Sequence, residues 1–389
     1  MNAGNRQPLR MLVTGGGTGG HTYPALTTVA TVREQAAAHG HDLDVLWVGT
    51  ASGLEARVAA ENGIPFRAIK TGKLRRSPNP RELLANLADM FRIPVGILQA
   101  FGIAARYRPD VVLSTGGYVC VPLGLASRLL RRPLVMHEQI TALGLANRIL
   151  ARFATRIALT HPSSIEHLPA PARERAAVTG NPVRPHLLRG NAPSGRWHFG
   201  FSPEVPLVYV TGGAQGSRQI NTLVEGILPV LLERAQVLHQ CGPGWIDQLT
   251  RTAEGLPEHL RERYRPVPYV GEELADVLAA ADVVVSRSGA GAVAELTAVG
   301  KPSVLVPLVP SAGDEQRQNA RYLAESGAAR ALLENGPEPE HLLAELDVLL
   351  GDPRLCADMS KAAKSLGRVD AAGALAGMVL EEAGVFGFR

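Results

Sequence analysis

The chain has 389 residues, of which 46% are hydrophobic and 20% charged, and its formal net charge is +4. The length exceeds what one hydrophobic core usually serves and the composition excludes a disordered chain, so we expect two globular domains. The small positive charge argues against a nucleic-acid partner, and three scattered cysteines form neither a disulfide framework nor a metal-ligand spacing.

The N-terminal residues 1–10 are polar and run directly into an apolar strand, without the apolar core of a signal peptide. No stretch approaches the roughly 20 apolar residues that a membrane-spanning helix needs. The cysteine usage suits a reducing compartment. We therefore expect a cytoplasmic protein, either soluble or peripheral to a membrane.

A glycine-rich turn follows the first predicted strand, 11–14, and precedes a helical segment at 24–38. It reads Thr14-Gly15-Gly16-Gly17-Thr18-Gly19-Gly20-His21. A strand that passes through small residues into a helix leaves unpaired backbone N–H groups at the helix N-terminus, where phosphate oxygens bind well. The turn therefore predicts a phosphate site.

The spacing of Gly15, Gly17 and Gly20 also fits the G-x-G-x-x-G fingerprint of dinucleotide-binding proteins. That fingerprint requires an acidic residue at the end of the second strand, to bind a ribose. Here the second predicted strand, 43–48, ends in Gly49-Thr50, so a nicotinamide dehydrogenase is disfavoured. Asp42-Leu43-Asp44 spells the D-x-D of some metal sites but lies far from the turn, and we expect neither a metal nor a cofactor.

The next segment, 72–107, combines an apolar helical face with basic neighbours. The apolar residues are Leu83, Leu87, Met90, Phe91, Ile93, Val95, Ile97 and Leu98, and the basic ones are Lys70, Lys73, Arg75, Arg76 and Arg81. Apolar insertion beside basic side chains favours an anionic bilayer surface. Packing of this helix on its own sheet explains the same pattern equally well.

Further strands are predicted at 111–114, 134–137 and 156–159, and then at 207–211, 237–240, 267–270, 283–286 and 304–307. Two prolines and a glycine in Thr179-Gly180-Asn181-Pro182-Val183-Arg184-Pro185 mark a domain boundary. We therefore predict domains at 1–183 and 184–365. The C-terminal region 353–382 is predicted to be helical, and by analogy with two-lobed folds the segment 366–389 returns to the first domain.

The second domain repeats the pattern of the first. Thr211-Gly212-Gly213-Ala214-Gln215-Gly216-Ser217 follows its first strand, and the sequence of 282–289 echoes that of 110–117. Repeated strand–loop–helix units of this kind predict an α/β fold of two doubly wound, Rossmann-like domains that face one another across a cleft, with ligands at the carboxyl ends of their strands.

These motifs, taken in order, resemble those of the MurG family of bacterial peptidoglycan glycosyltransferases, glycosyltransferase family 28. The matching residues are Gly16 to His21 with Pro24, Thr115-Gly116-Gly117-Tyr118-Val119, His137-Glu138-Gln139, Gly180 to Arg184, Gly212-Gly213 with Gln215-Gly216, Ser286 to Ala290 with Glu295, and Gln316 with Asn319. The resemblance implies the GT-B fold and the inverting transfer of GlcNAc from UDP-GlcNAc to the MurNAc 4-hydroxyl of lipid I, undecaprenyl-pyrophosphoryl-MurNAc-pentapeptide, at the cytoplasmic face of the membrane.

The resemblance also implies which residues contact the substrates. The first domain would bind the acceptor through Thr18, Gly19, Gly20, Tyr118, His137, Glu138 and Ile140. The second would bind the UDP-sugar through Arg184, Ala214, Gln215, Gly216, Val270, Ser288, Gly289, Ala290, Gly291, Ala292, Val293, Ala294, Glu295, Gln316 and Asn319. Val270 would contact the uracil, Glu295 the ribose, Gln316 the GlcNAc hydroxyls, and Arg184 with the first turn of the helix at 290 the diphosphate.

His21 is the candidate catalytic residue. Inversion at the sugar requires a base for the acceptor hydroxyl and no covalent intermediate, and an imidazole with a pKa of roughly 6.5 is largely neutral in the cytoplasm. His21 would act as this base or bind the acceptor pyrophosphate, whereas in a purely structural role it would cap or pack its helix. A buried structural role remains open for His137 and Glu138, and surface roles remain open for Glu295 and Arg184.

Five positions depart from the family pattern. Ile140 stands where an Asn is usual, Ala214 where a Ser is common and Ala292 where a Thr is common, and Cys120-Val121 replaces the usual Ser-Gly. Each lost side-chain hydrogen bond is worth on the order of 1 kcal/mol. A related enzyme with another lipid-linked or natural-product acceptor, a UDP-GlcNAc 2-epimerase and a catalytically silent nucleotide-sugar binder therefore remain alternatives.

Overall fold

The computed structural model describes residues 8–72, 80–140 and 143–386, and of residues 80–91 and 312 it describes the backbone alone. The chain divides into two compact units, the first made of Met1–Pro182 with Asp370–Arg389 and the second of Val183–Val369. Of the apolar and basic residues singled out in 72–107, the side chains of Leu83, Leu87, Met90, Phe91, Lys73, Arg75, Arg76 and Arg81 lie outside the described residues.

The first unit is built on a seven-stranded parallel sheet with the strand order β3-β2-β1-β4-β5-β6-β7. Its strands are β1 Leu9–Thr14, β2 Leu43–Gly49, β3 Phe66–Ala68, β4 Val111–Ser114, β5 Leu134–Glu138, β6 Arg156–Leu159 and β7 Ala176–Val178. Its helices are α1 Gly19–Ala38, α2 Leu54–Glu61, α3 Pro80–Tyr107, α4 Cys120–Leu129, α5 Leu145–Leu150, α6 Ala170–Arg173 and α16 Ala371–Glu382, with a 3-10 helix η1 Pro162–His167.

The second unit has a six-stranded parallel sheet with the order β10-β9-β8-β11-β12-β13. Its strands are β8 Leu207–Thr211, β9 Gln236–Gln240, β10 Tyr264–Val267, β11 Val283–Ser286, β12 Ser303–Leu305 and β13 Arg330–Ala331. Its helices are α7 Ala192–Phe199, α8 Arg218–Leu232, α9 Ile246–Glu254, α10 Glu258–Arg261, α11 Leu274–Ala280, α12 Ala290–Val299, α13 Glu315–Glu325, α14 Pro339–Gly351 and α15 Pro353–Leu366, with the 3-10 helices η2 Pro185–Arg189 and η3 Ala312–Asp314.

Both sheets are covered on both faces, which confirms the prediction of two doubly wound α/β domains. Successive residues of a strand point to opposite faces, and so Met11 and Val13 of β1 join one core cluster whereas Leu12 joins the other. Val208 and Tyr209 of β8 divide in the same way. These central strands are buried on both sides, as their uninterrupted apolar runs predict.

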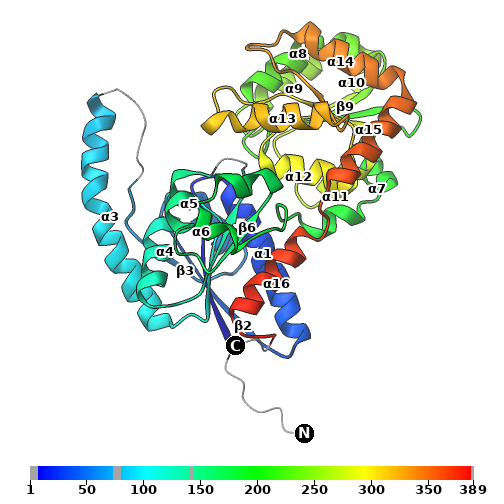
Figure 1. The fold of residues 1–389 in the computed structure, drawn as a ribbon. Helices are drawn as coiled ribbons and strands as arrows, with labels where there is room; N and C mark the ends of the chain where they lie inside the picture. The colour runs from blue at the N-terminus through cyan, green and yellow to red at the C-terminus, as the bar shows by residue number, and fades with distance from the viewer. Residues whose placement is uncertain (1–7, 73–79, 141–142, 387–389) are drawn as a thin grey trace. The chain divides into compact units, whose positions relative to one another are not determined.

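The last helix belongs to the first unit. Leu375, Ala376 and Val379 of α16 are fully buried in the core cluster that α1 also lines, and Figure 1 shows the red α16 beside the blue α1. The C-terminal helical region is thus two helices, α15 in the second unit and α16 in the first.

The predicted strand at 267–270 is wrong. The structure has β10 at Tyr264–Val267, which shares only Val267 with the prediction. Because β10 is an edge strand, only Tyr264 of its four residues is buried, and so no apolar run marks it. The short edge strands β3, β7 and β13 were missed for the same reason.

Among the described helices, none is long and apolar enough to cross a membrane.

Candidate functional site

In each unit, two glycine-containing loops meet where the strand order reverses. In the first sheet β1 and β4 are neighbours, and in the second β8 and β11 are neighbours. The loops after these strands begin at Gly15 and Thr115 in the first unit and at Gly212 and Arg287 in the second. Ligands of open α/β sheets bind at the carboxyl ends of the strands at this reversal point, so we describe the two loop pairs as the candidate site, one unit at a time.

The first glycine turn encloses a buried carboxylate that the sequence did not reveal as a site residue. Glu55 of α2 has 0% exposure. It accepts hydrogen bonds from the N–H of Gly17 at 3.1 Å, the N–H of Thr50 at 2.9 Å and the hydroxyl of Thr50 at 2.6 Å. The Glu55 side chain thus fixes the turn by hydrogen bonds to its backbone.

Three glycines make room for Glu55. A Cβ atom placed on Gly16, Gly49 or Gly53 would come within 2.6 Å of its side chain, which no real structure tolerates. The spacing Gly49-Thr50-x-x-Gly53-Leu54-Glu55 is the sequence signal that could have indicated this. Glu55 uses the N–H of Gly17, and the N–H groups of His21 and Thr22 donate to the carbonyl of Thr18. At the start of α1, the N–H groups of Gly19 and Gly20 are therefore those without an acceptor within the helix.

His21 lies in the first turn of α1 and is held through one ring nitrogen. Its Nδ1 is 3.0 Å from the carbonyl oxygen of Thr115 and 2.8 Å from Oε1 of Gln139. Burial lowers the pKa of His21, while the bonds to Gln139 and Thr115 oppose this shift. The imidazole is therefore neutral near pH 7, with Nε2 directed away from these two partners.

The structure buries His137 and Glu138, at 0% and 2% exposure. Burial raises the pKa of Glu138, whose carboxylate accepts hydrogen bonds from the N–H groups of Ile140 and Gly144 and from the amide of Asn147. Neither side chain is accessible to a ligand here. The turn that contains Ile140 is instead fixed by Glu138.

Tyr118 lies beside the first glycine turn. A Cβ atom on Gly17 would come within 3.1 Å of its ring, so Tyr118 lies where a ligand of Thr18, Gly19 or Gly20 would meet it. Gly116 and Gly117 precede it with φ angles of +102° and +86°, which favour glycine. The structure thus places Tyr118 beside the first glycine turn, whereas the side chains of His137 and Glu138 are buried.

The second glycine turn is held by close backbone contacts. Gly216 has a φ of +73°, and a Cβ atom there would lie 1.8 Å from the carbonyl oxygen of Cys241, so only glycine fits. Ser217 caps α8 by accepting from the N–H of Ile220 at 3.3 Å. Ala214 and Gln215 form the tip of this turn.

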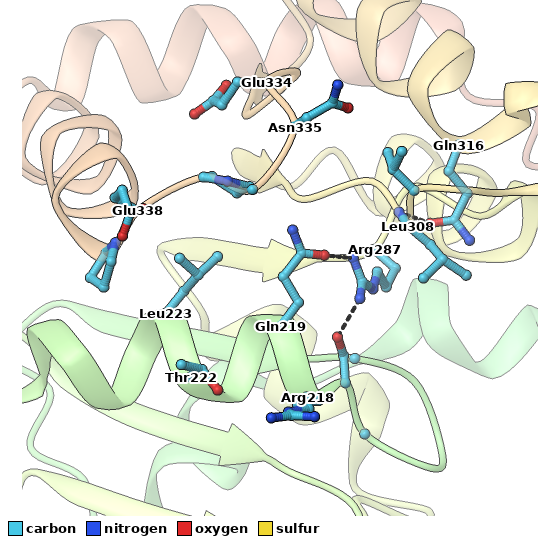
Figure 2. Close-up of a pocket in the computed structure, with 17 residues that line it drawn as sticks. Arg218, Gln219, Thr222, Leu223, Arg287, Leu308, Gln316, Glu334, Asn335 and Glu338 are labelled. Carbon is cyan, nitrogen blue, oxygen red and sulfur yellow. Dashed lines mark hydrogen bonds between the residues drawn. The ribbon is translucent and has the colours of Figure 1, made fainter.

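A pocket of about 1200 Å³ opens beside the second turn (Figure 2). Its lining includes Gly216, Arg218, Arg287, Gln316, Glu334 and Glu338. Arg287 donates to Gln219 at 2.7 Å and to Ser217 at 2.6 Å, and burial lowers its pKa to about 10. The pocket shares Gly216 and Gln316 with the predicted donor residues, but neither Arg184, Val270 nor Glu295 lines it.

Helix α12 begins at Ala290 after the N-cap Gly289. The loop before it is tied to α13, because Ser288 donates to the carbonyl of Gln316 at 2.7 Å and Asn319 donates to the carbonyl of Ser288 at 2.9 Å. Oε1 of Gln316 accepts from the N–H of Leu308. These contacts bring Gln316 and Asn319 to the N-terminus of α12, where Ala290, Gly291, Ala292, Val293 and Ala294 form the first turns.

Glu315 was not predicted to be part of the site. Burial raises its pKa, whereas its hydrogen bonds to the N–H of Ala290 and to Asn319 lower it. A carboxylate therefore lies at the N-terminus of α12. No pattern in the sequence distinguishes it from other acidic residues that begin a helix.

Arg184 and Glu295, which we predicted separately, form an ion pair. Nη2 and Nε of Arg184 are 2.9 and 3.2 Å from Oε1 of Glu295, and the side chains are 30% and 28% exposed. Val270 lies in the loop after β10 and is buried. Its N–H donates to Oε1 of Gln240 at 2.8 Å. Any backbone contact of Val270 with a ligand therefore falls to its carbonyl oxygen.

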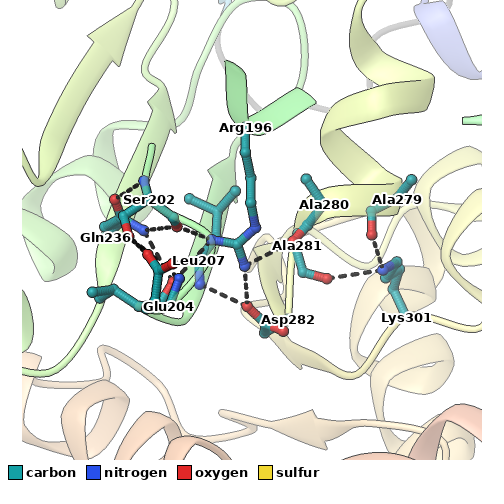
Figure 3. A network of polar contacts seen from close by, with 11 residues as sticks. Arg196, Ser202, Glu204, Leu207, Gln236, Ala279, Ala280, Ala281, Asp282 and Lys301 are labelled. Carbon is teal, nitrogen blue, oxygen red and sulfur yellow. Dashed lines mark hydrogen bonds and ion pairs between the residues drawn. The ribbon is translucent and has the colours of Figure 1, made fainter. Parts of the chain in front are cut away.

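A separate polar network lies at the opposite, amino-terminal edge of the second sheet (Figure 3). Arg196 bridges the carbonyls of Ser202 and Val205 to Asp282, which also accepts from the N–H of Leu207 at 2.8 Å. These groups satisfy one another at the starts of β8 and β11. The network is structural and belongs to no candidate site.

Among the described residues no three His, Cys, Asp or Glu side chains gather as a metal site requires.

Two family models match the chain. The glycosyltransferase family 28 N-terminal domain matches residues 11–159, and the glycosyltransferase family 28 C-terminal domain matches residues 207–375. The matched segments contain both glycine turns, His21 and Glu295.

Curated relatives match over most of their length. The chain is 37% identical over 364 residues to the UDP-N-acetylglucosamine–N-acetylmuramyl-(pentapeptide) pyrophosphoryl-undecaprenol N-acetylglucosamine transferase of Desulforudis audaxviator, covering 92% of this chain and 95% of that protein. It is 36% identical to the second transferase of that name in Bacillus cereus, covering 87% and 91%.

Solved structures show the same fold. The crystal structure of MurG from Acinetobacter baumannii has a TM-score of 0.73 at 26% identity and covers 96% of this chain and 100% of that one. A putative UDP-N-acetylglucosamine 2-epimerase from Listeria monocytogenes has a TM-score of 0.65 at 17% identity and covers 94% of each chain. At that identity the second likeness shows the fold alone.

Proposed function

The chain belongs to glycosyltransferase family 28, and from this premise we propose that it transfers GlcNAc from UDP-GlcNAc to the 4-hydroxyl of MurNAc in undecaprenyl-pyrophosphoryl-MurNAc-pentapeptide. This reaction converts lipid I to lipid II in peptidoglycan synthesis. The observation that carries the proposal is the similarity, at 32 to 37% identity and over most of both chains, to transferases of that name.

We assign the UDP-sugar to the second unit. Both bonds of the Arg184 guanidinium go to Oε1 of Glu295, so Oε2 is the oxygen that we assign to the ribose hydroxyls. The first turn of α12 supplies N–H groups for the diphosphate, because a helix N-terminus favours negative charge. Gln316, held at that turn through α13, is assigned to the GlcNAc hydroxyls.

We assign catalysis and the acceptor to the first unit. The hydroxyl of MurNAc attacks the anomeric carbon as the bond to UDP breaks, and UDP leaves with the bonding electrons while Nε2 of His21 takes the hydroxyl proton. Inversion needs no covalent intermediate. The start of α1, at Thr18, Gly19 and Gly20, is assigned to the acceptor pyrophosphate, with Tyr118 beside it.

We propose that α3 contacts the anionic cytoplasmic face of the membrane. The side of α3 that packs on the protein carries Ala100 and Ala104, which are 0% and 1% exposed, with Ile103 and Tyr107 partly buried beside them. The large apolar side chains Val95, Leu98 and Phe101 are 40%, 72% and 38% exposed. They are spaced three apart and lie on one helical face, so packing on the sheet does not explain the apolar character of these three positions.

The reaction is tested by incubating the purified protein with radiolabelled UDP-GlcNAc and a short-chain lipid I analogue. We expect labelled GlcNAc in the lipid product. Formation of UDP-ManNAc instead would indicate an epimerase, and tight UDP binding without any product would indicate a silent binder. Transfer to another lipid-linked acceptor, but not to lipid I, would contradict the assigned acceptor.

Substitution His21→Ala tests the proposed base. Removal of a general base costs about a hundredfold or more in turnover, whereas UDP binding to the second unit should not change. Steady-state kinetics and calorimetric titration with UDP measure the two effects, with His167→Ala, an exposed histidine of the same unit, as the control. Unchanged turnover of His21→Ala would remove this role.

A further inference from the structure

His137, Gln139 and His21 form a chain of hydrogen bonds inside the first unit. Nε2 of His137 is 3.0 Å from the carbonyl oxygen of Gly180, and its Nδ1 is 3.1 Å from Nε2 of Gln139. The other end of the Gln139 amide, Oε1, is 2.8 Å from Nδ1 of His21. His137 and Gln139 are 0% and 4% exposed, so water does not compete for these bonds.

The carbonyl of Gly180 determines the protonation of His137. A carbonyl oxygen only accepts hydrogen bonds, so Nε2 of His137 carries the proton. Burial lowers the pKa of His137 to about 4, so the ring is neutral near pH 7 and its Nδ1 is an acceptor. Only the NH₂ end of the Gln139 amide can bond to that nitrogen.

The orientation of Gln139 then determines the proton on His21. With its NH₂ group directed to His137 and to the carbonyl of Thr115, at 3.1 and 2.6 Å, its oxygen faces His21. An amide oxygen accepts, as does the Thr115 carbonyl 3.0 Å from the same ring nitrogen. Both partners therefore require a proton on Nδ1, and in the neutral ring Nε2 has none.

We propose that Gln139 and His137 are positioning residues that hold His21 as the Nδ1–H tautomer and so leave Nε2 as a bare acceptor toward the substrate. The inference deepens the proposed function, because it rests on that function for what Nε2 does. In the opposite tautomer Nε2 would already carry a proton, and so it could not accept one from the acceptor hydroxyl. The proposal also gives His137 and Gln139, which are joined to His21 by hydrogen bonds, a role that needs no contact with substrate.

The site is built to keep His21 in one place as well as in one tautomer. Cβ atoms on Gly116 and Gly117 would lie 3.0 Å from Nδ1 and 3.4 Å from Cδ2 of the His21 ring, so the backbone of this loop lies against the imidazole. The hydroxyl of Thr115 donates to the carbonyl of His21 at 2.7 Å. Thr115 thus binds the residue through both its main chain and its side chain.

Nuclear magnetic resonance of the ¹⁵N-labelled imidazoles tests the proposal without substrate. In the full-length wild-type protein at pH 7.5, the signals lost in His21→Asn should show a protonated Nδ1 and a pyridine-type Nε2. The signals lost in His137→Asn should show the reverse. Finding His21 with its proton on Nε2 would overturn the proposal, even if the enzyme is active.

Substitution Gln139→Met removes the amide and keeps the side-chain length. We expect the His21 signals to move toward a mixture of tautomers, because only the Thr115 carbonyl then holds Nδ1–H. We also expect kcat to fall about tenfold with the KM for UDP-GlcNAc unchanged, since the second unit is untouched. The control is Gln35→Met, which removes a glutamine of α1 that donates to Gly373.

The positioning role of Gln139 and the role of His21 as base can be overturned independently of one another. An unchanged Nδ1–H spectrum in Gln139→Met would overturn the positioning role, whatever the rate. A wild-type spectrum with the expected tautomers, a shifted spectrum in Gln139→Met and full activity of His21→Asn would instead leave the positioning role in place and overturn His21 as the base.

Discussion

Glu55 has a structural role that we did not predict from the sequence. A carboxylate with no exposure is costly unless hydrogen bonds replace its lost hydration, and here the glycine turn and Thr50 provide them. The turn was predicted to bind phosphate through its N–H groups. One of these groups already binds an anion of the protein, so the phosphate position moves toward the start of α1.

Substitution Glu55→Ala should therefore destabilise the first unit. It leaves the N–H groups of Gly17 and Thr50 buried without an acceptor and opens a cavity among three glycines, and together these effects cost about 3 kcal/mol. Urea unfolding followed by circular dichroism measures the loss. Glu61→Ala, on the exposed side of the same helix, removes only a surface ion pair with Arg57 at 3.6 Å and should change stability by less than about 0.5 kcal/mol. Equal effects would contradict this role of Glu55.

At the scale of elements, the N-terminus of α12 combines two opposed charges. Its N–H groups favour a diphosphate, but the hydrogen bond from Ala290 goes to Glu315, whose pKa is raised by burial. A bound diphosphate would lie close to this carboxylate. Without a ligand, the Glu315 carboxylate therefore takes the Ala290 N–H that a diphosphate would otherwise bind.

Glu315→Gln should raise the affinity for UDP about three- to tenfold, because the amide keeps the hydrogen-bonding shape without the like charge. In the wild type, affinity should also rise as the pH falls toward the raised pKa of Glu315 and the carboxylate takes up a proton. Calorimetric titration with UDP at pH 7.5 and pH 6 measures both effects. Glu325→Gln, at the exposed end of the same helix, is the control. A fall in affinity on Glu315→Gln would show that the carboxylate supports the ligand.

Helix α3 supports a prediction about the membrane. Replacing Val95, Leu98 and Phe101 together by Ser should weaken binding to vesicles of anionic phospholipid at least tenfold, because each side chain contributes about 1 kcal/mol on insertion. Sedimentation with vesicles measures the bound fraction. The matched control replaces Leu129, Val230 and Val348, which are 65%, 50% and 45% exposed on other helices. Equal losses in the two variants would rule out α3 as the specific contact.

At the scale of the whole molecule, the elements that the sequence predicted are those with two-sided burial. The central strands β1, β4, β8 and β11 are continuous apolar runs with glycine turns behind them, and all four lie where predicted. The edge strands β3, β10 and β13 are short and half exposed, so local pattern does not separate them from loops. The sequence therefore predicts the strands that are buried on both faces and misses the exposed edge strands.

The candidate site likewise contains some features that the sequence predicts and others that it does not. His21 and the glycine turns were recognisable because their chemistry depends on neighbours in the chain. The Arg184–Glu295 pair joins residues 111 positions apart, and the orientation of Gln139 depends on Gly180, 41 positions further along. Such partnerships arise only when the sheet brings distant loops to one edge. These contacts determine the tautomer of His21 and the pairing of Arg184 with Glu295, neither of which can be predicted from the sequence.

Buried neutral histidines also make the stability of the molecule dependent on pH. Burial lowers the pKa of His239 in the second unit to about 3, where it bonds to Tyr264 at 3.0 Å and to Asn221 at 3.1 Å. In the unfolded chain its pKa is roughly 6.5. Between these values the unfolded state binds a proton that the folded state does not, so stability is full above about pH 6.5 and falls as the pH decreases.

Between pH 7.5 and pH 5, His239 alone should cost the wild type about 2 kcal/mol, because 1.5 pH units below the unfolded pKa correspond to about 1.4 kcal/mol each. In His239→Gln this loss should disappear, and the urea midpoints of the two proteins should converge as the pH falls. Other titrating groups act equally in both proteins and cancel from the difference. A difference between wild type and His239→Gln that stays constant with pH would mean that His239 is charged in the folded protein.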